Sequence, residues 1–481
     1  MTALRQAAVS GIKWAAVSQI GRQILVFGTL VLLTRLVGPQ NYGLLSMAIT
    51  ITGFVDLLKD LGTGAAIIQR SECDDSLLAS TFWLNLGIGT LCTALIALGA
   101  PLAALYFREP GVTPVLRLLS ISFVISSLGL VQLALIQRSI AFRALALVEI
   151  SAAVAGATVG VGMGLSGMGV WSLVGQTLAT TLTTTILAWV ASPWRPRMRF
   201  DRSAIETIRS YGAGLVGFNI ANYIIRNADY ALVGRYLGTL SLGIYTLAYR
   251  IMLFPQQSLS LVISRVMFAV LARIEDDARF RRAYLQLTAM IAFLATPIFI
   301  VLGTLREPLV RAAFGPEWLP AAPLLLVLAP VGLFQSLSGT VGLIYQARAR
   351  TDWLLRWGVG AGVITVIGFI IGLRWGIFGV TAAYAIVTLV TAYPAFAIPF
   401  TLIGLSVTEF VCGLLPALAC GAGMLLVILG LAPLTTGLPD LGELALLGAT
   451  GGAVYLGLSW WLNRSAIHEV ARMLSNGGTQ P

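Results

Sequence analysis

Long apolar runs, separated by short polar connections, fill nearly the whole chain. A run of roughly 20 apolar residues can cross a lipid bilayer as a helix, and the sequence divides into fourteen of them. The predicted spans are about 11–36, 42–68, 77–105, 114–137, 143–165, 168–192, 209–236, 240–270, 283–304, 321–346, 353–373, 376–402, 409–431 and 441–463. Separating the first two depends on the turn-forming residues 38–41. The predicted fold class is therefore an all-α polytopic membrane protein with 14 transmembrane helices.

Composition agrees with this pattern. Hydrophobic residues make up 57% of the chain and charged residues 11%, whereas soluble domains average about 25% charged residues. The net charge of +11 comes mostly from arginines in short loops, as the positive-inside rule predicts. No basic domain remains to bind nucleic acid. The arginine-rich connections fall on one side, so we expect both termini to be cytoplasmic.

A sequence repeat divides the chain. Arg35, Gly38 and Gly43 recur 200 residues later as Arg235, Gly238 and Gly243. Three further pairs keep the same order, namely Phe107 with 116–119 and Phe314 with 324–327, 135–142 and 344–351, and 169–170 and 379–380. Six spans per repeat predict two parallel halves related by an axis along the membrane normal. The expected parts are 1–192 (first lobe), 193–208 (cytoplasmic linker), 209–402 (second lobe) and 403–481 (two further spans and a cytoplasmic tail).

Four polar residues share one face of the seventh predicted span. They are Asn219, Asn222, Arg226 and Asp229, at spacings of three, four and three. Arginine or aspartate at the centre of a membrane helix costs about 2.5–3.5 kcal/mol on insertion scales. We therefore expect this face to line a watery cavity or the bundle interior, where it contacts substrate.

The first span carries matching polar groups, because Gln19 and Arg22 align with Asn219 and Asn222 in the repeat. Arg22 is predicted to bind substrate; the alternative is that its long side chain reaches the membrane surface.

Arg250 is a third arginine at membrane depth and lies five residues before Pro255. Proline inside a helix favours a kink, so this pair indicates either a hinge beside a substrate-binding cation or a static bend. Arg35 and Arg235 suit the outer ends of their helices and are predicted to be structural.

Carboxylates at membrane depth are candidates for coupling or gating. Asp56, Lys59 and Asp60 form a cluster in the second span, which is either a structural lock between helices or an ion-coupled gate. Glu149 reads as a lone carboxylate, serving as a helix-packing group or a proton site. Asp229 joins this group, and Pro255 is the candidate gating hinge.

The cations at membrane depth are mostly arginines, whose planar guanidinium groups bind phosphate oxygens in pairs. This favours an anionic, phosphorylated substrate over an organic cation. The four cysteines show no CxxC spacing, and the single histidine lies in the C-terminal tail. We expect no catalytic residue, no metal and no cofactor.

Three segments carry a family resemblance. They read LTRLVGPQNYGLLSMA, FVDLLKDLGTGAAIIQR and NYIIRNADYALVGRYLGTLSLGIYTLAYRIMLFP. They resemble the polysaccharide transport (Wzx-type) flippases of the multidrug/oligosaccharidyl-lipid/polysaccharide superfamily, and most of all the colanic-acid-exporter-like branch. The matching signature positions are Asn222, Arg226, Asn227, Asp229, Gly234, Arg235, Gly238 and Gly243.

The resemblance implies a flippase of the bacterial inner membrane that moves undecaprenyl-pyrophosphate-linked oligosaccharide units by alternating access. It also implies two six-helix lobes around a central cationic cavity. The last two spans look like the helix pair that forms a groove for the isoprenoid tail in the related lipid II flippases. Expected partners are this lipid, the bilayer, a proton or sodium ion as coupling ion, and the polymerase and glycosyltransferases of the same pathway.

Two other function classes stay open. A multidrug/cation antiporter of the same superfamily would be expected to have more cavity carboxylates and fewer arginines. A polysaccharide polymerase or ligase would need a sizeable outer loop with catalytic residues, and the longest outer loop, around 305–320, carries only Arg306, Glu307, Arg311 and Glu317.

Overall fold

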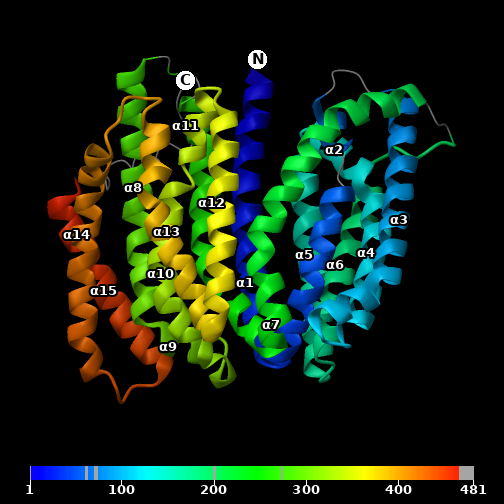
Figure 1. Ribbon diagram of the computed structural model, residues 1–481. Coiled ribbons are helices and arrows are strands. Elements are labelled where there is room, and N and C mark those ends of the chain that lie inside the picture. The colour runs from blue at the N-terminus through cyan, green and yellow to red at the C-terminus, as the bar shows by residue number, and fades with distance from the viewer. Residues whose placement is uncertain are drawn as a thin grey trace. The chain divides into compact units, whose positions relative to one another are not determined.

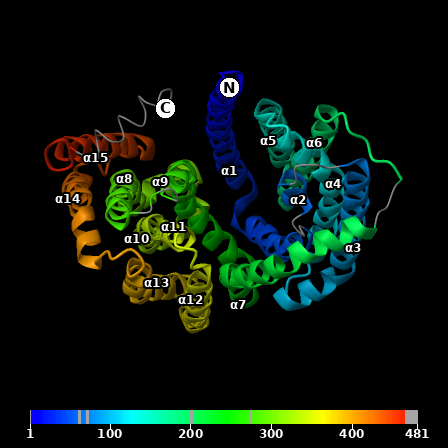
Figure 2. The ribbon, with the colours of Figure 1, turned by 90° about the horizontal axis from the view of Figure 1, so that it is seen from above.

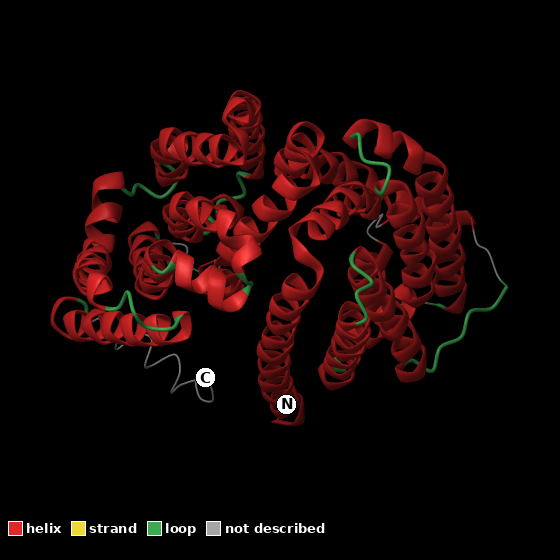
Figure 3. Ribbon diagram, turned by 90° about the horizontal axis from the view of Figure 1, so that it is seen from below, coloured by secondary structure: helices red, strands yellow, loops and turns green. Residues whose placement is uncertain are grey.

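The structure is a computed structural model that describes residues 2–59, 63–69, 74–198, 202–271, 274 and 276–464, with side chains from residue 21 onwards except at 58, 65–66, 69, 202–221 and 258–271. The described chain is helical throughout, with no strand (Figures 1 and 3). It forms two compact units, Met1–Gly243 and Ile244–Pro481.

Six helices and the start of a seventh make up the first unit. They are α1 (Thr2–Lys59), α2 (Thr63–Gln69), α3 (Asp75–Phe107), α4 (Val112–Arg138), α5 (Phe142–Leu165), α6 (Val170–Ala191) and the first part of α7 (Arg202–Leu271). Helix α4 packs between α3 and α6, and α5 pairs with α6 (Figure 2). Small residues permit the close packing of α5 on α6, since a Cβ at Gly156 would lie 1.9 Å from Thr180 Oγ1.

The second unit contains the rest of α7 and the later helices. These are α8 (Asp277–Thr304), α9 (Arg306–Ala313), η1 (Pro316–Ala321), α10 (Ala322–Ser338), α11 (Val341–Ala347), α12 (Thr351–Gly372), η2 (Leu373–Trp375), α13 (Gly376–Phe400), α14 (Val407–Leu431), η3 (Ala432–Leu434) and α15 (Asp440–Leu462). The terminal helices α14 and α15 pack on each other and on α8, where the Tyr455 hydroxyl donates to the Phe293 carbonyl at 2.8 Å.

Eleven helical stretches of the described chain are long and apolar enough to cross a membrane. Three of them, Gly21–Leu57, Asn222–Gln257 and Thr351–Phe400, each cover two of the spans that the sequence separates, and each of the others matches one. The all-helical membrane fold is thus confirmed. The predicted count of fourteen is not confirmed. Each of the three longer stretches contains one predicted boundary, and the α-helix is interrupted there, at Gly38, at Gly238 and at η2.

The two longest helices bend at matching glycines. Helix α1 has its one non-helical residue at Gly38 (φ 75°) and α7 at Gly238 (φ 84°), both in the left-handed region that only glycine adopts without strain. The helix then resumes. The first glycine of each repeated element thus provides the backbone conformation of the bend.

The second glycine of each element marks a direct backbone contact. A Cβ at Gly43 would lie 1.8 Å from the Thr239 carbonyl oxygen, and one at Gly243 would lie 1.9 Å from the Pro39 carbonyl oxygen. The two copies of the repeated element therefore cross at their glycines, where no other residue fits.

Another repeated feature lies at the ends of α4 and α11. Ile140 (φ 56°) and Ala349 (φ 53°) are both non-glycine residues in the left-handed region, at equivalent places in the segments 135–142 and 344–351 that the sequence analysis matched. One match is weaker: Gly169 has φ 55° just before α6, whereas Gly379 lies inside α13. The common backbone geometry at Ile140 and Ala349 supports a duplicated six-span unit.

Candidate functional site

The polar face of α7 is the centre of the candidate site. Asn222 and Arg226 are exposed, and Arg226 has no hydrogen bond or ion pair with any described residue. Asp229 is 2% exposed, and its Oδ1 accepts the backbone N–H of Tyr230 at 2.9 Å. The face thus places an accessible guanidinium one helical turn from a buried carboxylate. The side chain of Asn219 lies outside the described residues.

Tyr223 fixes this part of α7 against the second half of α1. Its hydroxyl donates to the Thr50 carbonyl at 3.0 Å, and its ring lies 6.2 Å from that of Phe54. The glycine opposite makes room, because a Cβ at Gly53 would lie 2.3 Å from the hydroxyl oxygen. Arg226 therefore projects from a helix that is anchored less than one turn away.

Arg22 and Glu149, predicted as separate candidates, form an ion pair between α1 and α5. The distance from Arg22 Nε to Glu149 Oε2 is 3.9 Å, with side chains 43% and 38% exposed. The description of Glu149 as a lone carboxylate is therefore wrong, because the hydrophobic pattern of one segment does not show that α1 packs on α5. Within the described residues, Glu149 is the one ion-pair partner of Arg22. The side chain of Gln19 lies outside the described residues.

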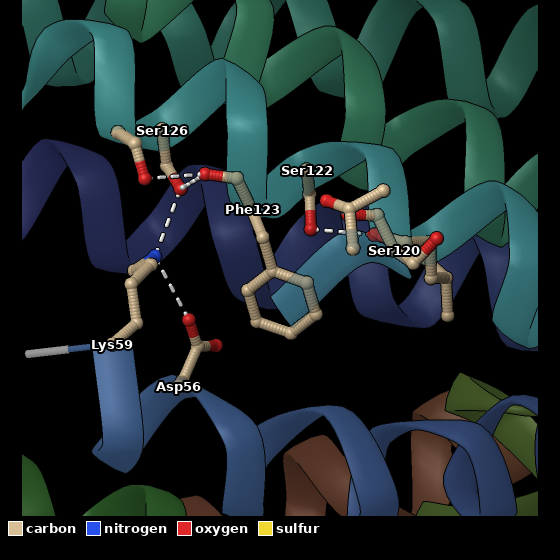
Figure 4. A network of polar contacts seen from close by, with 9 residues as sticks. Asp56, Lys59, Ser120, Ser122, Phe123 and Ser126 are labelled. Carbon is tan, nitrogen blue, oxygen red and sulfur yellow. Dashed lines mark hydrogen bonds and ion pairs between the residues drawn. The ribbon is translucent and has the colours of Figure 1, made fainter. Parts of the chain in front are cut away.

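A second ion pair lies at the end of α1. Lys59 Nζ is 2.9 Å from Asp56 Oδ1 and donates to Ser126 Oγ on α4 at 2.8 Å (Figure 4). The ammonium also lies 5.5 Å from the centre of the Phe123 ring. The side chain of Lys59 is only 12% exposed and that of Asp56 is 57% exposed. Of the predicted cluster, Asp60 lies outside the described residues.

This pair joins α1 to α4, and its members differ in burial, so we expect their removal to have unequal effects. Asp56→Leu leaves a buried ammonium without its counter-ion and should lower stability by about 1–3 kcal/mol. Lys59→Met leaves only an accessible carboxylate and should cost less than about 1 kcal/mol. Thermal unfolding of the purified protein measures both.

The double variant Asp56→Leu/Lys59→Met is the control. It should recover most of the stability lost in Asp56→Leu, because it removes the unpaired charge. Equal losses for the two single variants, with no recovery in the double variant, would contradict a lock based on the buried lysine.

In the second unit, Arg250 is exposed on α7, and the helix continues through Pro255 with helical backbone angles. The one backbone break in α7 is at Gly238. A hinge at Pro255 thus stays a prediction, because the interruption of the α7 backbone lies at Gly238.

Arg235 has the structural role predicted for it. Its Nη1 donates to the Leu105 carbonyl at 3.3 Å, and its guanidinium lies 5.7 Å from the Tyr106 ring centre. It ties α7 to the end of α3.

Sequence reasoning missed a neutral polar cluster formed by Tyr249, Gln335 and Tyr384 on three helices of the second unit. The one available signal was that Gln335 interrupts an apolar run. Within the described chain, no three His, Cys, Asp or Glu side chains gather where they could hold a metal ion.

Comparison with known proteins gives one family match. The model of the family described as "Polysaccharide biosynthesis protein" matches residues 32–323, which is more than half of the chain. The matched region includes both copies of the glycine element and the residues Glu149, Arg226 and Arg250.

Several relatives have similar sequences. The lipopolysaccharide biosynthesis protein WzxC of Escherichia coli K12 is 27% identical over 80% of this chain and 80% of its own. The teichuronic acid biosynthesis protein TuaB of Bacillus subtilis 168 is 27% identical over 81% and 82%. The succinoglycan biosynthesis transport protein ExoT of Rhizobium meliloti 1021 is 29% identical over 66% and 64%.

Two solved structures have a similar fold. The lipid II flippase MurJ in an inward closed conformation matches with a TM-score of 0.76 over 94% of this chain and 99% of its own, at 16% identity. An inward-facing multidrug resistance MATE family transporter matches with a TM-score of 0.66 over 81% and 98%, also at 16% identity. At this identity the likeness concerns the fold alone.

Proposed function

We propose that this chain, which belongs to the polysaccharide biosynthesis protein family, is a flippase that moves lipid-linked oligosaccharide units across a membrane. The observation that carries the proposal is the family match over 32–323, a region in which Arg226 is exposed without a hydrogen bond or ion pair to any described residue. Relatives named for polysaccharide biosynthesis and transport support the same class.

The finer proposal concerns the lipid. An undecaprenyl-pyrophosphate carrier presents several phosphate oxygens, and arginine binds such oxygens in pairs. Arg226 and Arg22 have guanidinium groups accessible to such a headgroup. We assign pyrophosphate contact to Arg22, Arg226 and Arg250, in a central cavity that they line, with Gln19, Asn219 and Asn222 as neutral partners.

We further propose fourteen spans arranged as two six-helix lobes, 1–192 and 209–402, joined by a cytoplasmic linker at 193–208. The helices of 403–481 are assigned to the lipid tail. The protein would lie in the bacterial inner membrane with both termini in the cytoplasm, work by alternating access, and serve the polymerase and glycosyltransferases of one polysaccharide pathway.

Deletion of the gene tests the function in cells. The deleted strain should lose the surface polysaccharide and accumulate the lipid-linked oligosaccharide in the cytoplasmic leaflet, and the intact chain should restore export. Normal export together with increased sensitivity to cationic drugs would instead favour the multidrug antiporter.

Coupling to a proton gradient is the role we propose for Glu149, with Asp56, Lys59, Asp60, Asp229 and Pro255 as further coupling or gating candidates. Protonation of Glu149 would remove the partner of Arg22 and free the guanidinium for phosphate. In proteoliposomes, a proton gradient should speed flipping by the parent protein severalfold and leave the rate of Glu149→Gln unchanged.

Glu109→Gln is the matched control, since Glu109 lies in the short connection between α3 and α4. It should keep the response of the parent protein. A response to sodium alone, or an unaltered response in Glu149→Gln, would contradict the proton role.

A further inference from the structure

Three neutral polar side chains meet in the second unit, from helices distant in sequence. Tyr249 on α7 and Tyr384 on α13 have their hydroxyl oxygens 3.2 Å apart. Gln335 on α10 donates from Nε2 to the Tyr384 hydroxyl. The two tyrosine rings have centroids 6.0 Å apart, and all three residues are half-buried.

Partial accessibility distinguishes this cluster from the tyrosines that only hold helices together. The Tyr284 hydroxyl bonds to Thr340 Oγ1 at 2.9 Å, and the Tyr455 hydroxyl bonds to the Phe293 carbonyl at 2.8 Å. Those two tyrosines are 0% and 2% exposed. A bond that only joins helices is best protected by full burial, whereas Tyr249, Gln335 and Tyr384 are each partly exposed.

The rings of the cluster are held in fixed positions. Tyr249 stacks on the buried Tyr245 at 5.9 Å with an interplanar angle of 21°, and Tyr384 lies 5.7 Å from Phe369 on α12. Side chains locked by their neighbours lose little entropy when a ligand binds. The cluster is therefore pre-organised for contact.

Its chemistry suits hydroxyl groups. Phenol hydroxyls and a primary amide can both donate and accept hydrogen bonds, and none of the three side chains carries a formal charge. A phosphate would favour cationic partners. An uncharged ligand that is rich in hydroxyl groups, and whose C–H groups can pack on an aromatic ring, fits this cluster better than a phosphate does.

The duplicated fold gives an independent comparison. Ser126 on α4 and Gln335 on α10 differ by 209 residues, the same difference that separates the left-handed Ile140 and Ala349. In the first unit Ser126 accepts a hydrogen bond from the ammonium of Lys59. In the second unit Gln335 bonds to a neutral tyrosine. The corresponding regions of the two repeats thus each hold a polar network, with a lysine ammonium in the first unit and with uncharged side chains in the second.

We infer that Tyr249, Gln335 and Tyr384 form a contact site for the neutral sugar residues of the transported lipid. The inference rests on the proposed flippase function and assigns different parts of the lipid to different residues. The pyrophosphate is bound by arginines, and the sugars are bound by this cluster of the second unit.

The experiment compares two lipids, undecaprenyl pyrophosphate and the same lipid carrying the oligosaccharide, in binding to the full chain in nanodiscs. The double variant Tyr249→Phe/Tyr384→Phe keeps both rings and removes both hydroxyls. It should bind the oligosaccharide-bearing lipid about tenfold more weakly and the bare pyrophosphate lipid as well as the parent protein does. Gln335→Leu should lower affinity for the same lipid only.

Tyr455→Phe is the matched control. It removes a buried hydroxyl of the same unit and should lower thermal stability without changing the ratio of the two affinities. Equal weakening of both lipids in Tyr249→Phe/Tyr384→Phe, or a loss of stability alone, would overturn the sugar site while leaving the flippase proposal in place. Failure of the parent protein to bind either lipid would overturn both.

Discussion

Gly43→Ala should destabilise the protein by at least about 3 kcal/mol, beyond the usual range for an overpacked position. The added Cβ would lie 1.8 Å from the Thr239 carbonyl oxygen, and a backbone atom cannot rotate away as a side chain can. The helices would have to separate where the two copies of the repeated element cross. Gly243→Ala should act alike, since its Cβ would meet the Pro39 carbonyl oxygen at 1.9 Å.

Gly28→Ala is the control on the same helix, because a Cβ at Gly28 meets nothing within 4 Å. Alanine is the better helix former by about 0.8–1 kcal/mol, so this variant should be as stable as the parent or slightly more so. Yield of monodisperse protein and thermal unfolding measure all three. A Gly43→Ala protein as stable as Gly28→Ala would contradict the close backbone crossing.

Loss of Arg226 should reduce export of the polysaccharide about tenfold to a hundredfold in Arg226→Ala. Hydrogen bonds to charged groups contribute about 1.5–3 kcal/mol, and each 1.4 kcal/mol is tenfold in binding. Because Arg226 is exposed and has no ion pair among the described residues, its removal leaves no buried charge unpaired. Protein level should therefore stay normal while export falls.

Two further arginine variants distinguish the effect of the positive charge of Arg226 from the effect of its planar guanidinium group and from a general loss of stability. Arg226→Lys keeps the charge but not the planar fork, and should retain part of the export. Arg235→Ala removes the contacts with Leu105 and Tyr106 and should lower stability without weakening phosphate recognition. Normal export by a stable Arg226→Ala protein would remove Arg226 from the substrate site.

The sequence predicted the positions of single helices well, because they depend on local patterns. The predicted span 114–137 corresponds to α4, Val112–Arg138, and the predicted span 441–463 to α15, Asp440–Leu462. The repeated glycines stood out for the same reason, since each serves a local backbone need at Gly38 and Gly238. The predicted family resemblance is confirmed by the match over 32–323.

Contacts between helices could not be predicted in the same way. The sequence marked Gly43 and Gly243 as equivalent but not as touching, because the repeat does not specify which faces cross. Likewise Arg22 and Glu149 lie on helices whose pairing depends on the packing of α1 with α5. Hydrophobic periodicity orients a single helix and carries no information about its neighbour.

The neutral cluster was missed for a different reason. Tyr249 and Tyr384 lie within apolar segments, where the sequence does not distinguish them from other membrane-spanning positions. Their role depends on hydroxyl groups from α7 and α13 meeting Gln335 of α10. The charged residues attracted attention because charge is costly in a membrane, whereas a neutral site leaves almost no trace in the sequence.

The most direct test of the account is the movement of a fluorescent undecaprenyl-pyrophosphate-linked oligosaccharide between leaflets of proteoliposomes that contain the purified chain. The account predicts rapid movement with the parent protein, a rate at least about tenfold lower with the folded Arg226→Ala protein, and no movement of an undecaprenol that lacks the pyrophosphate. Equal rates for the parent protein and Arg226→Ala, or for the lipid with and without pyrophosphate, would contradict the recognition of a lipid phosphate by arginines at membrane depth.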